Sequence, residues 1–341
     1  MTEYAVEALE MRYDVTTIRI STADGLDGLG EPSVRKLIRL LRIFMRVIRE
    51  TWLGRFDLVY ITLSPTSGAF FKDAFLFSLA RLRVPSGLIH LHGKGVRAAV
   101  ARRPWMGPLY RLVFGLGTVI HLAESLVGDI AGFASKVRVL PNGIPVPDAA
   151  SGERDLDFLF LSNLIESKGP FVLLQALRSL ADEGIGFKAA FCGKFLNETD
   201  RRRFQSVVAG LPNGSVELIE GLYGDAKFAL LRRAKVFVLP TFYPNECFPL
   251  SILEAMGSGC AVVSTEEGAI SDMLDEGRSG FIVRREDSAA LAVVLRHLRD
   301  DRASLQKFSD AGNQRFLSLY TKHAFVSGLL TISEDELKRG C

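Results

Sequence analysis

The sequence has few cysteines and no long apolar run. Its 341 residues include four cysteines, and these show neither C-x-x-C spacing nor a preceding secretory signal sequence. A disulfide scaffold is therefore excluded, and a reducing, cytoplasmic location is expected. No run approaches the roughly 18 apolar residues that a helix needs to cross a bilayer. We therefore expect that the chain does not span a membrane.

Internal repeats and low-complexity tracts are also lacking. Hydrophobic residues make up 48% and charged residues 24% of the chain, values typical of a packed globular protein. Disordered and collagen-like classes are thus excluded. At roughly 100 to 200 residues per domain, the length predicts two domains.

Acidic residues are scarce between residues 33 and 111. This stretch holds 15 basic residues and only Glu50, Asp57 and Asp73, although the net charge of the whole chain is +3. Such a field attracts an anionic partner. Anionic lipid, nucleic acid and a phosphorylated substrate all fit the composition, which does not choose among them.

Strand-length apolar runs alternate with helical patterns along most of the chain, which predicts an α/β fold with parallel sheets. The turn-rich stretch 141–153 is the expected domain linker. A helix is predicted over residues 1–14, a strand over 15–20, and helices with a frayed tail from residue 301 onward. Further strands are predicted at 56–63, 87–91, 136–140, 156–161, 188–192 and 235–239.

Arginines line one face of a predicted helix over residues 34–50. They recur at spacings of 4, 3, 4 and 3, so they share one side of the helix. A solvated face of a helix packed on a sheet and an interfacial helix near anionic lipid both fit this pattern. The arginines are Arg35, Arg39, Arg42, Arg46 and Arg49, and the apolar residues assigned to the opposite side are Leu37, Ile38, Leu41, Phe44, Met45 and Ile48.

The segment 246–259, ECFPLSILEAMGSG, is the most informative stretch for chemistry. Pro249 suits the first turn of a helix, and Gly257 and Gly259 suit its end. Glu246 then lies in the loop before the helix and Glu254 lies inside it. Free backbone N–H groups at a helix start bind phosphate, and flanking carboxylates accept hydrogen bonds from sugar hydroxyls. This arrangement favours a sugar nucleotide.

These residues resemble the retaining GT-B glycosyltransferases often called family 4, whose signature is E, seven residues, then E, with F-G or F-P between. The resemblance extends through FLFLSNLIESKGPFVLLQAL, FCGKF, LYGDAKFALLRRAKVFVLPTFYPNE, HLHGKG and VLPNGIPV. It implies two Rossmann-like, doubly wound domains facing each other across a cleft. The expected parts are an acceptor-side domain over 1–145, a nucleotide-sugar domain over 146–310, and helices over 311–341 that return to the first domain.

By the same resemblance, His92 and Glu246 would contact the donor sugar at the reacting carbon. Glu254 would hold the ribose, and Lys168 would neutralise the departing diphosphate, which gains charge in the transition state. Further donor contacts are implied for Asn163, Gly193, Leu222, Tyr223, Phe248 and Leu250. No metal and no cofactor beyond the donor, a UDP-sugar or GDP-sugar, is expected.

The chain departs from the family pattern in two places. Ser162, Asn163 and Leu164 stand where the family has G-R-L, so one diphosphate cation is absent from its usual position. The family's first strand and its glycine-rich turn have no counterpart before Arg12. Either the N-terminal domain starts differently from the family pattern, or its first strand and the loop after it are missing from this sequence.

Two other motifs and a pair of histidines also bear on the chemistry. His92 lies at the end of the apolar stretch GLIHLH, residues 87–92, and His90 points to the same face of that strand. Residues 93–98 fit G-x-G-x-x-A, but the acid that should grip ribose about 20 residues later is lacking, which disfavours a nicotinamide enzyme. Asp155 and Asp157 form a D-x-D that leads into a strand, so a metal role is not expected.

The sequence thus predicts sugar transfer with retention, in surface polysaccharide or glycolipid assembly, on the inner face of the membrane. The charge suggests a lipid-linked or other anionic acceptor. The alternatives are a non-catalytic or truncated sugar-nucleotide-binding protein and a GT-B sugar-nucleotide epimerase. Nucleic-acid binding is not expected, because no base-reading motif is present.

Overall fold

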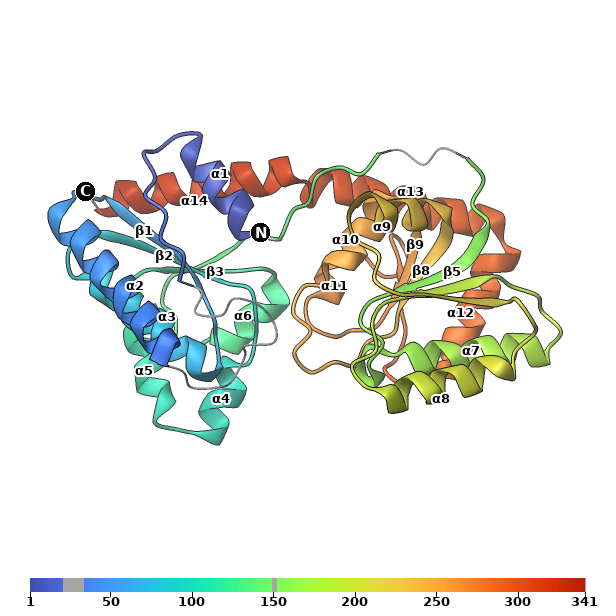
Figure 1. Cartoon of the computed structure of the whole chain (residues 1–341). Coiled ribbons are helices and arrows are strands. Elements are labelled where there is room, and N and C mark those ends of the chain that lie inside the picture. The colour runs from blue at the N-terminus through green and yellow to red at the C-terminus, as the bar shows by residue number, and fades with distance from the viewer. Residues whose placement is uncertain (21–33, 149–151, 341) are drawn as a thin grey trace. The chain divides into compact units, whose positions relative to one another are not determined.

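The structure, a computed structural model, describes residues 1–20, 34–148 and 152–340. The chain divides into two compact units, of which the first is Met1–Leu140 with Val326–Cys341 and the second is Pro141–Phe325. Each unit is built on a parallel sheet with helices between its strands (Figure 1). The predicted α/β fold with two parallel sheets is therefore confirmed.

The first unit holds a parallel sheet in the order β1-β2-β3-β4. All six residues of β2 are buried, as its apolar run predicts. Aromatic side chains of α3 and α5 fill the core, where the rings of Phe70 and Tyr110 lie 4.4 Å apart. The elements are α1 (Thr2–Glu10), α2 (Val34–Leu53), β1 (Leu58–Leu63), α3 (Ser67–Arg81), β2 (Ser86–Leu91), α4 (Val96–Arg102), α5 (Met106–Phe114), β3 (Thr118–His121), α6 (Glu124–Ile130) and β4 (Val137–Val139).

Residues 15–20 form no strand, so the prediction of a strand there was wrong. Side chains take carbonyl groups that a strand would offer to a neighbour: Lys72 Nζ donates to Ile20 O at 2.7 Å, and Arg46 Nη2 donates to Thr17 O at 3.3 Å. Ile18 and Ile20 pack against apolar residues of α2 and α3. The apolar spacing of this segment therefore reflects packing on helices.

Helix α14 (Lys322–Gly340) is anchored on the first unit through its C-terminal part. The buried Glu336 accepts a hydrogen bond from Thr118 Oγ1 at 2.6 Å, and Arg12 pairs with Glu334. The helix continues to Gly340, so the frayed tail expected at the end was wrong. Burial of Glu336 against β3 explains why the last turns stay helical.

In the second unit the strands are ordered β10-β9-β8-β5-β6-β7, and all pairs are parallel. The chain winds in one direction from β5 to β7 and in the other from β8 to β10. The strand order therefore reverses between β5 and β8. In open α/β sheets, ligands bind outside the carboxyl ends of the strands at such a reversal.

The sheet of the second unit is flanked by helices, with α7 and α12 packed against each other. Helix α13 belongs wholly to this unit, where it packs on α10 and β9. The elements are β5 (Leu156–Leu161), α7 (Pro170–Asp182), β6 (Ala189–Cys192), α8 (Glu198–Ala209), β7 (Val216–Ile219), α9 (Gly224–Arg233), β8 (Ala234–Leu239), α10 (Leu250–Gly257), β9 (Ala261–Ser264), α11 (Ile270–Met273), β10 (Phe281–Ile282), α12 (Ser288–Asp300) and α13 (Arg302–Leu319).

Candidate functional site

Lys168 and Glu246 meet at the strand reversal of the second unit. Lys168 follows β5 in a short 3-10 turn, and Glu246 follows β8 in the loop that leads to α10. Lys168 Nζ lies 2.5 Å from Glu246 Oε2, and both side chains are largely buried. The structure therefore brings together two residues that the sequence predicts for one donor site.

A tight glycine turn next to Lys168 and side-chain contacts from the loop of Glu246 surround the Lys168–Glu246 pair. Gly169, at φ +84°, turns the chain directly into α7, and a Cβ there would lie 2.1 Å from Pro240 O. Thr241 Oγ1 donates to Glu246 Oε2 at 3.2 Å, and Lys168 Nζ lies 4.6 Å from the centre of the Tyr243 ring. Only glycine fits at position 169 in this conformation.

Helix α10 begins directly after the Glu246 loop. Pro249 is its N-cap and not a residue of its first turn, a small correction to the prediction. Phe248 is buried with its ring 6.0 Å from that of Tyr320, and Leu250 is half-buried at the first helical position. The first backbone N–H groups of an α-helix have no partner within the helix, so this start suits an anion.

Glu254 lies inside α10, as predicted, and pairs with Lys227 of α9. Lys227 Nζ lies 2.6 Å from Glu254 Oε1, and the two side chains expose 22% and 12% of their surface. Burial raises the pKa of the Glu254 carboxyl, and the hydrogen bond from Lys227 opposes that rise. Sequence reasoning missed Lys227, because no spacing rule links position 227 to position 254.

The remaining donor residues predicted by the resemblance lie in loops of the same unit. Gly193 directly follows β6. It lies so close to the loop after β5 that an added Cβ would be 1.8 Å from Ser162 O. Leu222 is half-buried, and Tyr223 is exposed with Lys194 Nζ 5.6 Å from its ring centre. Asn163 is exposed in the loop after β5. Their contact with a donor remains a prediction.

His92 lies in the first unit, directly after β2, next to two buried histidines. The rings of His90 and His92 lie 4.2 Å apart, and His90 Nδ1 lies 2.7 Å from Tyr60 Oη. Burial lowers the pKa of His90 well below its usual value and that of His121 to about 4. Both imidazoles are therefore neutral at pH 7. The role of His92 at the donor sugar stays a prediction.

Backbone N–H groups of the G-x-G-x-x-A stretch donate hydrogen bonds to a carboxylate of the chain itself. Asp129 Oδ2 accepts hydrogen bonds from Gly95 N at 2.7 Å and Val96 N at 2.9 Å, and Asp129 Oδ1 accepts one from Arg97 N at 3.0 Å. These N–H groups would have to bind a pyrophosphate in a dinucleotide-binding enzyme. The arrangement argues against that reading, in agreement with the sequence.

Asp155 and Asp157 are engaged in ion pairs with β8 and its flank. Arg233 binds Asp155 through two hydrogen bonds of 2.9 and 2.7 Å, and Lys235 Nζ lies 2.8 Å from Asp157 Oδ1. They thus act as structural carboxylates. Within the described ranges, no group of three or more His, Cys, Asp or Glu is placed to hold a metal ion.

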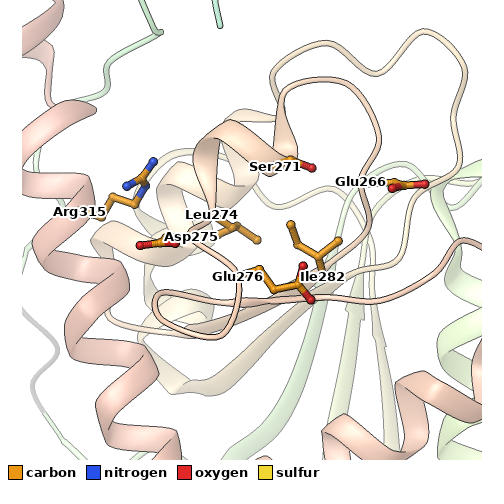
Figure 2. A pocket seen from close by; sticks show the side chains of 7 residues that line it. All are labelled: Glu266, Ser271, Leu274, Asp275, Glu276, Ile282 and Arg315. Carbon is orange, nitrogen blue, oxygen red and sulfur yellow. The ribbon is translucent and has the colours of Figure 1, made fainter. Parts of the chain in front are cut away.

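A separate hollow of about 550 Å³ opens near α11 in the same unit. Three of its seven lining residues are acidic, Glu266, Asp275 and Glu276, and Arg315 stands at one side (Figure 2). None of the donor residues discussed above lines it. Glu266 belongs to the loop after β9, in which Glu267 pairs with Arg285 at 3.1 Å.

The described part of α2 corrects the predicted faces of the arginine helix. Ile43 and Val47, which the prediction did not place on the apolar side, are buried against Leu76 and Ala80 of α3. Ile38, Leu41 and Met45, assigned to the apolar side opposite the arginines, are 45%, 58% and 56% exposed. Ile43 and Val47, two positions after Leu41 and Met45 respectively, face the core instead. The apolar residues of α2 cover a broad part of the helix surface, so their pattern fits more than one orientation of the helix. The side chain of Arg35 lies outside the described residues, and Arg42, Arg46 and Arg49 are exposed.

No helix in the described ranges combines the length and the apolar composition needed to cross a bilayer.

Comparison with known proteins points to sugar transferases. The model of the family described as Glycosyl transferases group 1 matches residues 147–315. The putative colanic acid biosynthesis glycosyltransferase WcaL of Salmonella typhimurium is 30% identical over 145 residues, 41% of this chain and 35% of that protein. The phosphatidyl-myo-inositol mannosyltransferase of Mycobacterium leprae is 29% identical over 221 residues, 62% of this chain and 55% of that protein. The chain thus spans about a third to a half of these curated relatives.

Solved structures share the fold over most of the chain. Anabaena HepE in complex with UDP and glucose superposes with a TM-score of 0.67 at 19% identity, covering 89% of this chain and 83% of that one. A glycosyltransferase from Rickettsia africae superposes with a TM-score of 0.72 at 14% identity, covering 98% and 88%. The chain therefore has the GT-B fold of solved glycosyltransferases, and its residues 147–315 match the model of glycosyl transferases group 1.

Proposed function

We propose that this chain is a retaining, metal-independent glycosyltransferase of family 4 that transfers a hexose from a UDP-sugar or GDP-sugar to an acceptor hydroxyl. The observation that carries the proposal is the pair of buried lysine–glutamate contacts, Lys168–Glu246 and Lys227–Glu254, around the start of α10. It is supported by the sequence match over the same region, and solved neighbours of the same fold carry UDP in their described complexes.

In this proposal Lys168 exchanges partners when the donor binds. A diphosphate oxygen replaces the Glu246 carboxylate beside Lys168 Nζ, so the cation compensates the charge that develops on the leaving group. Glu246, released from the lysine, accepts hydrogen bonds from sugar hydroxyls near the reacting carbon. Thr241, which already donates to Glu246, keeps the carboxylate oriented during the exchange.

Glu254 would accept hydrogen bonds from the ribose, and Lys227 favours its ionised form. A buried carboxylate costs free energy unless it is paired, and Lys227 provides that pair at 2.6 Å. Phe248, Leu250 and the first N–H groups of α10 would line the phosphate side. His92 of the first unit would contact the sugar as the resemblance implies.

The acceptor we propose is a lipid-linked or other anionic sugar, in surface polysaccharide or glycolipid assembly at the inner face of the membrane. Two of the relatives are named for colanic acid and amylovoran biosynthesis, which supports the polysaccharide part. The matched proteins are transferases, so a non-catalytic binding protein or an epimerase is not favoured.

Calorimetric titration with UDP and with GDP in EDTA tests the donor site. One nucleotide should bind at micromolar strength, and Glu254→Ala should weaken it by about 1 to 3 kcal/mol, as expected for a hydrogen bond to a charged group. Glu217→Ala, which removes an exposed carboxylate from β7, is the matched control and should not change binding. If neither nucleotide binds to the folded protein, the proposal fails. Retention is tested separately, by NMR of the anomeric configuration of the product.

A further inference from the structure

Among the residues that the structure describes, the first unit carries an exposed apolar surface. On α2, Ile38, Leu41, Met45 and Trp52 are spaced by 3, 4 and 7 residues and so share one face. They are 45 to 58% exposed, whereas Ile43 and Val47 bury the opposite side of the helix against α3. The exposed stripe is therefore additional to the packed side of α2.

Aromatic side chains of α3 and of Trp105, the residue before α5, extend this stripe. Phe44 of α2 stacks on Phe75 at 5.6 Å, and Phe71, one turn before Phe75, stacks on Trp105 at 6.1 Å. Phe71, Phe75 and Trp105 are 40, 58 and 58% exposed. Helices α2 and α3 lie side by side (Figure 1). We call the surface formed by Ile38, Leu41, Met45, Trp52, Phe71, Phe75 and Trp105 the aromatic patch.

Cations border the aromatic patch on α2. Arg42, Arg46 and Arg49 are exposed beside the apolar stripe, and Arg83 lies over the Trp52 ring at 5.2 Å. Along the same helix a hollow of about 440 Å³ is lined by the guanidinium-bearing side chains of Arg19, Arg39, Arg42 and Arg46. Glu50, the acid within α2, lies 2.5 Å from Arg49.

We propose that the aromatic patch inserts into the interface of an anionic phospholipid bilayer, with the arginines at the level of the lipid phosphates. Apolar residues on one flank and arginines on the next are the arrangement of a helix that lies in a membrane interface. Exposed tryptophans favour the same depth, since the ring is apolar and its N–H is polar. Charge complementarity selects lipid phosphate over neutral lipid, and the arginine-lined hollow has room for a headgroup.

This inference goes beyond the proposed transfer reaction, because it concerns the first unit and needs no donor. The sequence predicts only that the arginine helix could lie in a membrane interface or near anionic lipid; the inference adds the aromatic side chains outside α2 that would insert with it. A second copy of the chain or a partner protein could instead cover the patch, and the experiment separates these outcomes.

The chain supplies its own probe, since its two tryptophans, Trp52 and Trp105, both lie in the patch. We expect a blue shift of tryptophan emission when vesicles of phosphatidylglycerol and phosphatidylcholine are added without nucleotide. Lipids brominated in the upper acyl chain should quench the emission. Vesicles of phosphatidylcholine alone should give neither effect. Added salt should weaken binding, because it screens exposed arginines.

Paired variants divide the contribution of the two flanks. Leu41→Ser with Met45→Ser should weaken vesicle partitioning roughly tenfold or more, since buried aliphatic side chains dominate insertion. Arg42→Gln with Arg46→Gln should weaken it on the order of fivefold per arginine. Val293→Ser with Leu317→Ser, at similarly exposed helical positions of the second unit, is the matched control and should leave partitioning unchanged.

Vesicle binding without a tryptophan shift overturns insertion, and equal binding to neutral vesicles overturns the role of the arginines. Absence of binding overturns the whole inference. A dimer that Leu41→Ser with Met45→Ser abolishes would assign the patch to a second copy. Nucleotide titration of the same protein reports the donor site independently, so failure here leaves the proposed function standing.

Discussion

Lys168 and Glu246, 78 residues apart in the chain, share a 2.5 Å contact between Nζ and Oε2 at the strand reversal of the second unit. Their side chains expose 14% and 8% of their surface. Two loops, after β5 and after β8, are thus tied together by one ion pair. Its geometry leads to the first prediction.

Lys168→Met should lower the free energy of unfolding by about 3 to 5 kcal/mol, because it leaves the buried Glu246 carboxylate without its cation. The double variant Lys168→Met with Glu246→Gln should recover part of that loss. Urea denaturation of both single variants and the double variant measures the coupling. Lys307→Met, on the exposed side of α13, should change stability by less than about 0.5 kcal/mol. Additive costs would contradict a coupled pair.

Nucleotide binding should weaken as the pH falls. The loss should begin at a higher pH than the titration of an ordinary glutamate. Burial raises the pKa of Glu254, and in the proposed donor site the protonated carboxyl would be a weaker acceptor for the ribose hydroxyls. Calorimetric dissociation constants between pH 8 and pH 5 measure the effect. Glu254→Gln should bind more weakly and with a flatter pH dependence. The same slope in the wild type and in this variant would assign the titration to another group.

Gly193→Ala should destabilise the second unit by 2 kcal/mol or more and remove nucleotide binding. The added Cβ would lie 1.8 Å from Ser162 O, so the loops after β5 and β6 must separate. Gly186→Ala is the control, because a Cβ there meets nothing within 4 Å. Thermal and urea denaturation of both variants give the comparison, and equal stability would show that the loops are not held at this distance.

The stability of the protein should rise with pH between about 4 and 6.5 through its buried histidines. Burial lowers the pKa of His121 to about 4, so in this range the unfolded chain binds a proton that the folded chain does not. The difference between this pKa and the usual 6.5 corresponds to at most about 3 kcal/mol of unfolding free energy. Below about pH 4 the contribution is lost.

In the wild-type protein the Leu122 N–H donates to His121 Nδ1 at 2.9 Å. His121→Asn keeps an acceptor for this N–H and removes the titration of the imidazole. The slope of unfolding free energy against pH should become shallower in this variant. His323→Asn, at an exposed position in the first turn of α14, should keep the wild-type slope. His90 has a pKa lowered in the same direction, so part of the slope should persist.

Much of the fold follows from local pattern. The predicted strand 156–161 is observed as β5 over the same residues, and 235–239 is extended by one residue as β8. These strands are buried on both faces, so their apolar runs are continuous. Residues 15–20 are less apolar, with three apolar residues of six. Neighbouring side chains capture their carbonyl groups, and local sequence does not encode those distant donors.

The candidate site could be predicted only in part for a related reason. Glu246 and Glu254 lie in one segment, so their helical context is local. Lys227 reaches Glu254 from another helix, and Asp129 reaches the loop at Gly95 from 34 residues away. Such contacts depend on strand order, which brings distant loops to one edge of a sheet.

The two lysine–glutamate contacts also determine how the second unit would respond to charge in solution. The cations there already carry internal counter-ions, so an arriving diphosphate meets little net field and must displace a carboxylate at contact distance. Such an exchange is short in range and screened weakly when buried. The exposed arginines of α2 lie at the surface, where salt in the medium screens their charge. A rise in ionic strength should therefore weaken membrane binding by the first unit far more than nucleotide binding by the second.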